Sequence, residues 1–211
     1  RAEFEAWQQP VPAPGALNMS EVFAFLRQRL PPETILTCGA GAYVVALHRF
    51  YRYTGFRTYL GPTSGAMGYG VPAGVAAKLV HPDRPVIAFA GDGDFLMNGQ
   101  ELATAAQYDA KVIFIVVNNG MYGTIRMHQE RHYPGRVSGT ALVNPDFAAL
   151  ARAYGLHGEV VEKTTDFAAA FERAWSANTA ALLELRIDPD SISPRTTLSA
   201  IRAEALKNKK A

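Results

Sequence analysis

Two apolar segments of this chain end in residues whose types suit a metal ion and a phosphate. The segment "PVIAFA" runs into "GDG", centred on Asp92, and the segment "KVIFIVV" runs into Asn118 and Asn119. The glycines on both sides of Asp92 permit a sharp turn with exposed backbone N–H groups, and a helix that begins near Asp94 would direct its N-terminus at the same space. Such a site suits phosphate oxygens, which a bare carboxylate would repel unless a cation lay between them. Mg²⁺ binds carboxylate, amide and phosphate oxygens, so the two segment ends predict a metal–diphosphate site.

The same residues also have purely structural interpretations. An aspartate between two glycines can simply close a turn, and asparagines are common where strands end. Asn118 is expected to act structurally, by orienting its loop. Cys38 is expected to be a small buried residue, because nothing near it in the sequence completes a metal or catalytic set.

The elements around these residues alternate between strand and helix patterns. Short apolar runs predict strands over residues 34–37, 85–90, 111–117, 156–162 and 181–187. Helical spacing of apolar residues predicts helices over residues 20–30, 43–50, 65–80, 94–109, 122–132, 144–155 and 166–178. This alternation predicts an α/β fold, with a doubly wound, mostly parallel sheet of about six strands and helices on both faces.

Three loops follow predicted strands at their carboxyl ends, over residues 38–43, 90–95 and 118–124. In doubly wound sheets, ligands bind beyond the carboxyl ends of the strands, near the point where the strand order reverses. If the three strands are neighbours, these loops converge on one crevice, and we expect the metal–diphosphate site to lie there.

Composition limits the classes of function. With 211 residues, 48% of them hydrophobic, the chain is long enough to bury a substantial core. A formal net charge of +2 is too small to predict nucleic-acid binding, and no apolar run predicts a membrane span or a secretory signal. The single cysteine excludes an intramolecular disulfide and favours a reducing compartment, so a cytoplasmic location is expected.

The chain divides into three parts. Residues 1–17 contain the proline-rich "QQPVPAPG" and are expected to be a linker from an N-terminal part outside this sequence. Residues 18–190 carry the alternating pattern and are predicted to form one diphosphate-binding domain. Residues 191–211 are predicted to be a basic C-terminal tail, which is either a solvated end or a lid.

The spacing of the two polar clusters resembles the signature of thiamine-diphosphate enzymes. In that signature GDG is followed at a set distance by NN, and residues 94–117 separate the two clusters here. The upstream segment "SGAMGYG" adds to the resemblance. From Leu17 to Pro189, the chain resembles the C-terminal, diphosphate-binding domain of the acetolactate synthase, pyruvate oxidase and 2-oxo acid decarboxylase family.

The resemblance implies roles for individual residues. It assigns Mg²⁺ to the side chains of Asp92 and Asn119 and to the backbone carbonyl of Met121. The residues that it assigns to the cofactor are Gly41, Ala42, Tyr43, Gly65, Met67, Asp92, Gly93, Asp94, Asn119, Tyr122, Gly123 and Thr124. Among these, Asp94 is expected to bind the diphosphate through its backbone N–H group. Met67 is either an ordinary core methionine or the apolar residue that supports the bent cofactor.

The resemblance also implies an enzyme that decarboxylates small 2-oxo acids, joins them to an acceptor, or does both. In this family the glutamate that activates the cofactor lies in an N-terminal pyrimidine-binding domain of the same or a neighbouring subunit. No catalytic residue is therefore expected in this chain, which by itself should be inactive, and a homodimer or homotetramer is expected. FAD would belong to a middle domain that these residues do not include. His128 occupies the place of a substrate-facing tryptophan of acetolactate synthases, so it is the candidate substrate-facing residue.

Two other functions fit parts of the pattern. A non-catalytic module would bind the cofactor or assist assembly, and it would need a partner domain. A plain nucleotide-phosphate binder is disfavoured, because the chain has neither a P-loop lysine motif nor a GxGxxG fingerprint. Continuation of the natural sequence upstream, into a domain with the family glutamate, would distinguish the enzyme from the module.

Overall fold

Six short segments form one parallel sheet in the computed structural model, which describes residues 2–209. The strands are β1 (Ile35–Cys38), β2 (Tyr59–Leu60), β3 (Val86–Gly91), β4 (Val112–Asn118), β5 (His157–Val161) and β6 (Ala181–Arg186). They lie in the order β2-β1-β3-β4-β6-β5, and every neighbouring pair is parallel. The predicted α/β fold with about six strands is confirmed. The two-residue strand β2, which is exposed, was not predicted because it lacks an apolar run.

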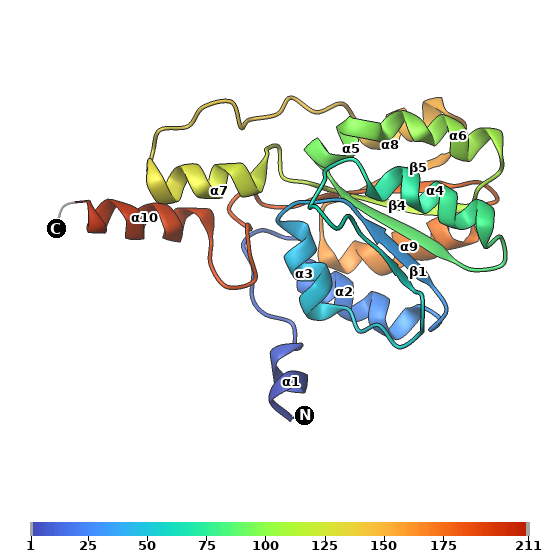
Figure 1. The fold of residues 1–211 in the computed structure, drawn as a ribbon, viewed down its shortest axis with the longest axis horizontal. Helices are drawn as coiled ribbons and strands as arrows, with labels where there is room; N and C mark the ends of the chain where they lie inside the picture. Colours follow the sequence, from blue (N-terminus) through green and yellow to red (C-terminus); the bar gives the residue numbers. More distant parts are fainter. Residues whose placement is uncertain (1, 210–211) are drawn as a thin grey trace.

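Helices cover both faces of the sheet and produce three layers (Figure 1). One face packs against α2 (Met19–Arg29), α3 (Tyr43–Phe50) and α9 (Thr164–Ser176). The other face packs against α4 (Gly70–Val80), α5 (Asp92–Asn98), α6 (Leu102–Gln107) and α8 (Phe147–Ala153). Along β3, Ile87 and Phe89 enter the first core, whereas Val86, Ala88 and Ala90 enter the second. Because both faces are buried, this strand has a continuous apolar sequence.

The helix predicted over residues 65–80 begins later, at Gly70. Gly65 and Gly68 adopt φ values of 65° and 84°, which a right-handed helix excludes. A Cβ atom on Gly70 would collide with the backbone at the end of β1, so the start of α4 lies directly against that strand end. Residues 61–69 consequently form a loop that approaches the carboxyl ends of the strands.

The helix predicted over residues 94–109 is divided in the structure. It begins two residues earlier, at Asp92, and consists of α5, the 3₁₀ turn η1 (Gly99–Glu101) and α6. A side chain at Gly99 would collide with the ring of Phe95, which is fully buried. The close approach of backbone and ring coincides with the break between the two helices.

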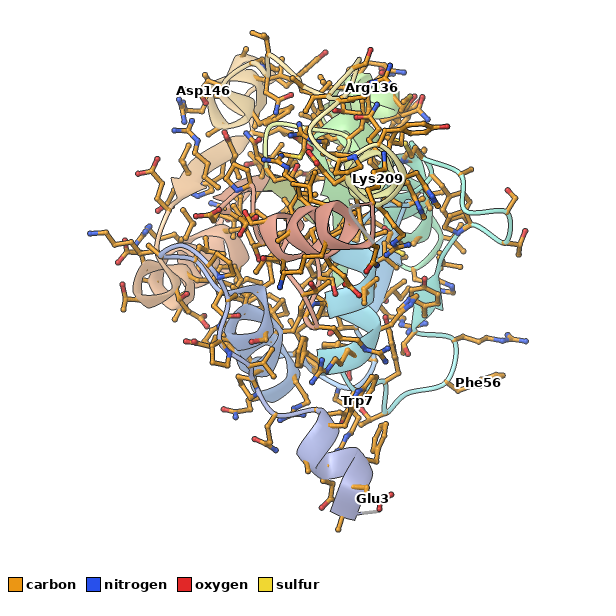
Figure 2. The ribbon with its side chains drawn as sticks, turned by 90° about the vertical axis from the view of Figure 1, so that its left-hand side faces the viewer. Glu3, Trp7, Phe56, Arg136, Asp146 and Lys209 are labelled. Carbon is orange, nitrogen blue, oxygen red and sulfur yellow. The ribbon has the colours of Figure 1, made fainter. Side chains whose placement is uncertain are left out.

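Two terminal helices and α7 (Gly123–His132) lie outside the three layers. α1 (Ala2–Trp7) projects from the body, and α10 (Leu198–Asn208) lies beside α7 (Figure 1). Figure 2 shows Phe56 at the outside of the molecule, on a loop that precedes β2. Over residues 2–209, no helix combines the length and the hydropathy that crossing a membrane requires. Residue 1 and residues 210–211, the ends of the predicted linker and tail, lie outside the described residues.

A small third core joins α10 to the body. Ile192, Leu198 and Ile201 are buried together, and Met121 and Met127 pack against them. The tail predicted from the basic C-terminal sequence is therefore a helix docked on the loop and helix that follow β4. The buried residues of α10, Leu198, Ile201 and Ala205, lie at helical spacing, but a local pattern does not identify the surface on which a helix docks.

A buried carboxylate reinforces the contact between α7 and α10. Glu130 is 1% exposed and accepts hydrogen bonds from Arg126 (2.9 Å), from Arg202 of α10 (2.7 and 2.5 Å) and from the backbone N–H of Gly135 (2.8 Å). These bonds, with that from Arg202 foremost, lower the pKa of Glu130 to about 2. A carboxylate held in this way stabilises the docked helix only while it is ionised.

We expect Glu130→Gln to lower the free energy of unfolding at pH 7 by about 2 kcal/mol, because the amide loses the charge-assisted bonds while Arg202 is partly exposed and screened. In the wild type this stabilisation is complete above the ordinary glutamate pKa of 4.5 and declines as the pH falls toward about 2. Urea unfolding at pH 7 and pH 3 should therefore show a smaller difference between the two proteins at pH 3. Exposed Glu204→Gln, on α10, is the control. An equal loss at both pH values would contradict the assignment.

Candidate functional site

The register of the sheet places three strand ends at one edge. Cys38, the last residue of β1, lies opposite Phe89 of β3. Gly91 ends β3 opposite Val117, and Asn118 ends β4 one residue further along. The strand order reverses between β1 and β3, because the chain proceeds from β1 to one side of the sheet and from β3 to the other. The loops after these strands therefore meet at the switch point, where ligands of doubly wound folds bind.

A cavity of about 430 Å³ opens at this edge. Every residue that the sequence assigned to the cofactor or the metal lines it: Gly41, Ala42, Tyr43, Gly65, Met67, Asp92, Gly93, Asp94, Asn119, Met121, Tyr122, Gly123 and Thr124. Residues 11–14 and 191–197 complete the wall. The proline-rich segment and the approach to α10 thus belong to the site. The sequence offered a lid as one of two roles for the tail, but it predicted no part in the site for the proline-rich segment, which was interpreted as a linker.

Asp92 stands at the junction of β3 and α5 and is 3% exposed. Its Oδ2 atom accepts hydrogen bonds from the backbone N–H of Gly120 at 2.9 Å and from the Asn144 side chain at 2.7 Å. Neither bond uses Oδ1. Burial raises the pKa of Asp92, although hydrogen bonds from Asn144 and from the backbone of Gly93, Gly120 and Asp92 itself oppose the increase. A buried carboxylate with one oxygen outside the two bonds to Oδ2, on the wall of a cavity, is a suitable ligand for a hard cation.

The loop after β4 presents further oxygen atoms to the cavity. Gly120 adopts φ of 71°, which turns the chain sharply after Asn119. The Asn119 side-chain oxygen accepts from the backbone N–H of Met121 at 3.2 Å, so the two predicted metal ligands of this loop lie together. The oxygen donors of Asp92, Asn119 and the Met121 carbonyl are the types that Mg²⁺ prefers, and the residues present therefore fit the ion.

Asp94 has a larger structural role than the backbone contact that the sequence predicted. Its side chain is 2% exposed and accepts from the Tyr43 hydroxyl at 2.6 Å and from the backbone N–H of Gly68 at 2.5 Å. It thereby ties the loop after β1 and the loop before α4 to the start of α5. A Cβ atom on Gly39 would collide with this carboxylate, which explains the glycine there. Burial raises the pKa values of both Asp94 and Tyr43.

The loop of residues 61–69 is held at two points. Besides the bond from Gly68 to Asp94, the carbonyl of Gly68 accepts from the Asn98 side chain at 2.8 Å. These bonds position Gly65 and Met67 on the cavity wall. Met67 is partly buried and does not belong to the described hydrophobic cores, so its role as a support for the cofactor stays a prediction.

His128 lies on the exposed side of α7, stacked on His132 with ring centroids 6.4 Å apart. The described structure does not place it on the cavity wall, unlike Thr124 on the first turn of the same helix. Its contact with a substrate therefore stays a prediction. Positions 124 and 128 are four residues apart, so they lie on the same side of α7, and His128 is about one turn further along the helix than Thr124.

Two polar residues next to the site were missed in the sequence. Asn144, between α7 and α8, donates to Asp92, and Glu184, which is fully buried on β6, accepts from Asn118 at 2.8 Å. A glutamate inside the apolar run "ALLEL" was a signal that could have identified Glu184, because a buried carboxylate needs partners. The sequence placed Asn144 at the start of the helix predicted over residues 144–155, but that helix begins at Phe147, and no local pattern indicated the bond from Asn144 to Asp92.

Comparisons with known proteins agree on one family. The family model described as "Thiamine pyrophosphate enzyme, C-terminal TPP binding domain" matches residues 39–185. The acetolactate synthase large subunit of Parasynechococcus marenigrum (strain WH8102) is 39% identical over 150 residues, which cover 70% of this chain and 24% of that protein. The acetolactate synthase isozyme 2 large subunit of Escherichia coli (strain K12) is 29% identical over 185 residues, 86% of this chain and 34% of that protein.

A solved structure shows the same fold. The thiamine diphosphate-dependent 4-hydroxybenzoylformate decarboxylase of Rhodococcus jostii RHA1 matches with a TM-score of 0.80 and 32% sequence identity, over 88% of this chain and 35% of that chain. The chain thus spans about a quarter to a third of the length of these relatives. These matches confirm the resemblance predicted from the spacing of GDG and NN.

Proposed function

Because this chain belongs to the thiamine pyrophosphate enzyme family, whose C-terminal TPP-binding domain it carries, we propose that its cavity binds thiamine diphosphate together with Mg²⁺. The complete protein would act on 2-oxo acids by decarboxylation, carboligation or both. The observation that carries the proposal is the position of Asp92. This buried carboxylate lies on the cavity wall at the start of a helix, where phosphate groups bind well but a negative side chain requires a cation.

The residues of this chain would hold and orient the cofactor. Asp92, Asn119 and the Met121 carbonyl would bind Mg²⁺, and the loops that begin at Gly41 and Tyr122 would surround the diphosphate. When bound, thiamine diphosphate supplies the carbanion and the electron sink for chemistry at a 2-oxo carbon. The protein's contribution is position, a fixed electrostatic environment and the exclusion of water by the cavity wall.

The names of the relatives support the substrate class. One relative is an acetolactate synthase and another decarboxylates 4-hydroxybenzoylformate, which is a 2-oxo acid. We propose that the substrate of the complete protein is also a small 2-oxo acid.

The surface beside the cavity supports a need for a partner domain. Tyr69, Leu96 and Met97 are 38%, 44% and 47% exposed; Tyr69 ends the loop that contains Gly68, and the other two lie on α5, the helix that contains Asp94. We propose that an N-terminal pyrimidine-binding domain covers this face, from the same subunit or a neighbouring one in a homodimer or homotetramer. A cytoplasmic location and a flavin in a middle domain belong to the same proposal.

The acidic residues of the described cavity wall are Asp92 and Asp94, and both are held by hydrogen bonds within the chain. Neither is free to act as the activating carboxylate. This observation favours completion of the active site by a partner, and it also keeps a non-catalytic cofactor-binding module as the second candidate.

The isolated 211-residue chain is expected to bind thiamine diphosphate and Mg²⁺ weakly, to self-associate through its apolar face, and to show no turnover of pyruvate or related 2-oxo acids. Calorimetry, light scattering and a carbon dioxide release assay measure the three properties. Addition of the N-terminal domain should restore turnover. Cofactor binding by the natural protein without turnover of any 2-oxo acid would support the module instead. Turnover by the isolated chain would place the activating carboxylate within it.

A further inference from the structure

A polar network runs from Asp92 into the interior, away from the cavity. The Asn144 side-chain nitrogen donates to Asp92 Oδ2 at 2.7 Å and to Asn118 Oδ1 at 2.9 Å. The Asn118 nitrogen in turn donates to Glu184 Oε1 at 2.8 Å. These four residues come from the start of α5, from β4, from β6 and from the segment before α8, so the network joins elements that are distant in sequence.

Glu184 anchors the far end of this network. Its side chain is fully buried and accepts from the Arg186 side chain at 2.9 Å and from the backbone N–H of Phe147 at 3.2 Å. Phe147 is the first residue of α8 and lies three residues after Asn144. The carboxylate therefore fixes both the orientation of the Asn118 amide and the start of the helix that follows Asn144.

The orientation of each amide follows from its neighbour. A carboxylate can only accept, so Asn118 must direct its nitrogen toward Glu184 and its oxygen in the opposite direction. That oxygen requires donors, which are the backbone N–H of Gly120 at 3.0 Å and the nitrogen of Asn144. The second hydrogen of the same Asn144 nitrogen is then directed at Asp92. Asn144 Oδ1 is buried and has no hydrogen-bond partner among residues 2–209, so the nitrogen side of the amide determines its placement.

We propose that Asn144 is a positioning residue for Asp92. Its bond holds Oδ2 of the carboxylate toward the interior, and it leaves Oδ1 for the cation on the cavity side. This inference rests on the proposed function, since the cation is the Mg²⁺ of the diphosphate site. It assigns to Asn144 an effect on metal affinity that a helix-capping or loop-shaping residue would not have.

The test measures Mg²⁺ binding in the natural protein that contains these residues. Asn144→Ala should raise the Mg²⁺ dissociation constant, measured by calorimetry at saturating thiamine diphosphate, by about 10- to 100-fold, as is usual when a residue that orients a metal ligand is removed. Asn144→Ser keeps one donor and should lie between the wild type and Asn144→Ala. It also provides the same comparison if the alanine variant fails to fold.

Asp146→Ala is the matched control. Asp146 caps α8 from the same segment by accepting from Ala149 at 2.7 Å, and it has no bond to Asp92. It should lower the melting temperature and leave the Mg²⁺ dissociation constant within about twofold. The inference fails if Asn144→Ala and Asn144→Ser bind Mg²⁺ as the wild type does, or if Asp146→Ala weakens Mg²⁺ equally. Absence of Mg²⁺-dependent binding in the wild type would instead refute the proposed function.

Discussion

Asp92→Ala is expected to abolish Mg²⁺-dependent binding of thiamine diphosphate. The substitution removes the charged ligand of the proposed metal site, and no other carboxylate of the described cavity wall can replace it, because Asp94 is committed to Tyr43 and Gly68. Asn119→Ala should weaken binding less, since water can replace a neutral oxygen ligand. Isothermal calorimetry with and without Mg²⁺, on the natural protein, measures both effects.

The fold should survive this substitution. Burial raises the pKa of Asp92, which means that its ionised form is unfavourable in the folded protein without a cation. The two donors that bond Asp92, the Gly120 N–H and the Asn144 nitrogen, both keep Asn118 Oδ1 as an acceptor. Removing Asp92 should therefore change the melting temperature of the ligand-free protein little, while the stabilisation by added Mg²⁺ and cofactor disappears. Wild-type cofactor affinity in Asp92→Ala would refute the metal assignment.

Asp94→Ala is expected to damage the fold itself, unlike Asp92→Ala. It leaves the Gly68 N–H without its acceptor in a buried region, and an unpaired donor costs about 1–3 kcal/mol. The Tyr43 hydroxyl loses its shorter bond and keeps the Phe89 carbonyl, at 3.2 Å, as an acceptor. Relief of the buried charge offsets part of the cost, so we expect a net loss of about 2 kcal/mol in the free energy of unfolding. Urea denaturation measures it, with exposed Asp83→Ala as the control for removal of a surface aspartate.

The pH dependence of the Asp94 effect has a defined sign. Its folded-state pKa is raised by burial above the ordinary 3.8, so its favourable contribution is complete below that value and declines as the pH rises through the folded pKa. The difference in stability between the wild type and Asp94→Ala should therefore be larger at pH 3.5 than at pH 7. A difference that grows with pH would contradict burial as the main cause of the shift.

Much of the site follows from the sequence because its signals are local. The strands that end at Gly91 and Asn118 are continuous apolar runs, and a parallel sheet brings the glycine, aspartate and asparagine residues that follow such strands to one edge. The same locality explains the successful placement of α3 and α9, whose apolar residues repeat with helical spacing.

The contacts that complete the site link residues far apart in the chain. Asp94 and Gly68 are 26 residues apart, Asn144 and Asp92 are 52 apart, and Glu130 and Arg202 are 72 apart. The spacing of residue types along the chain does not indicate pairs that are so far apart in sequence. The roles of the Asp94 and Asn144 side chains and the docking of α10 therefore emerged only from the structure.

The sequence by itself determined the residue types at the strand ends and the alternation of strand and helix that predicts a parallel sheet, because strand and helix periodicity depend on neighbouring residues. The strand order, which makes β1, β3 and β4 neighbours, was given by the structure. Only the tertiary structure decided which oxygen of Asp92 faces inward, which loops Asp94 joins and where His128 lies. Those outcomes depend on burial and on the pairing of hydrogen-bond donors with acceptors from other elements. A buried polar group forms hydrogen bonds with the partners that the packed fold places next to it.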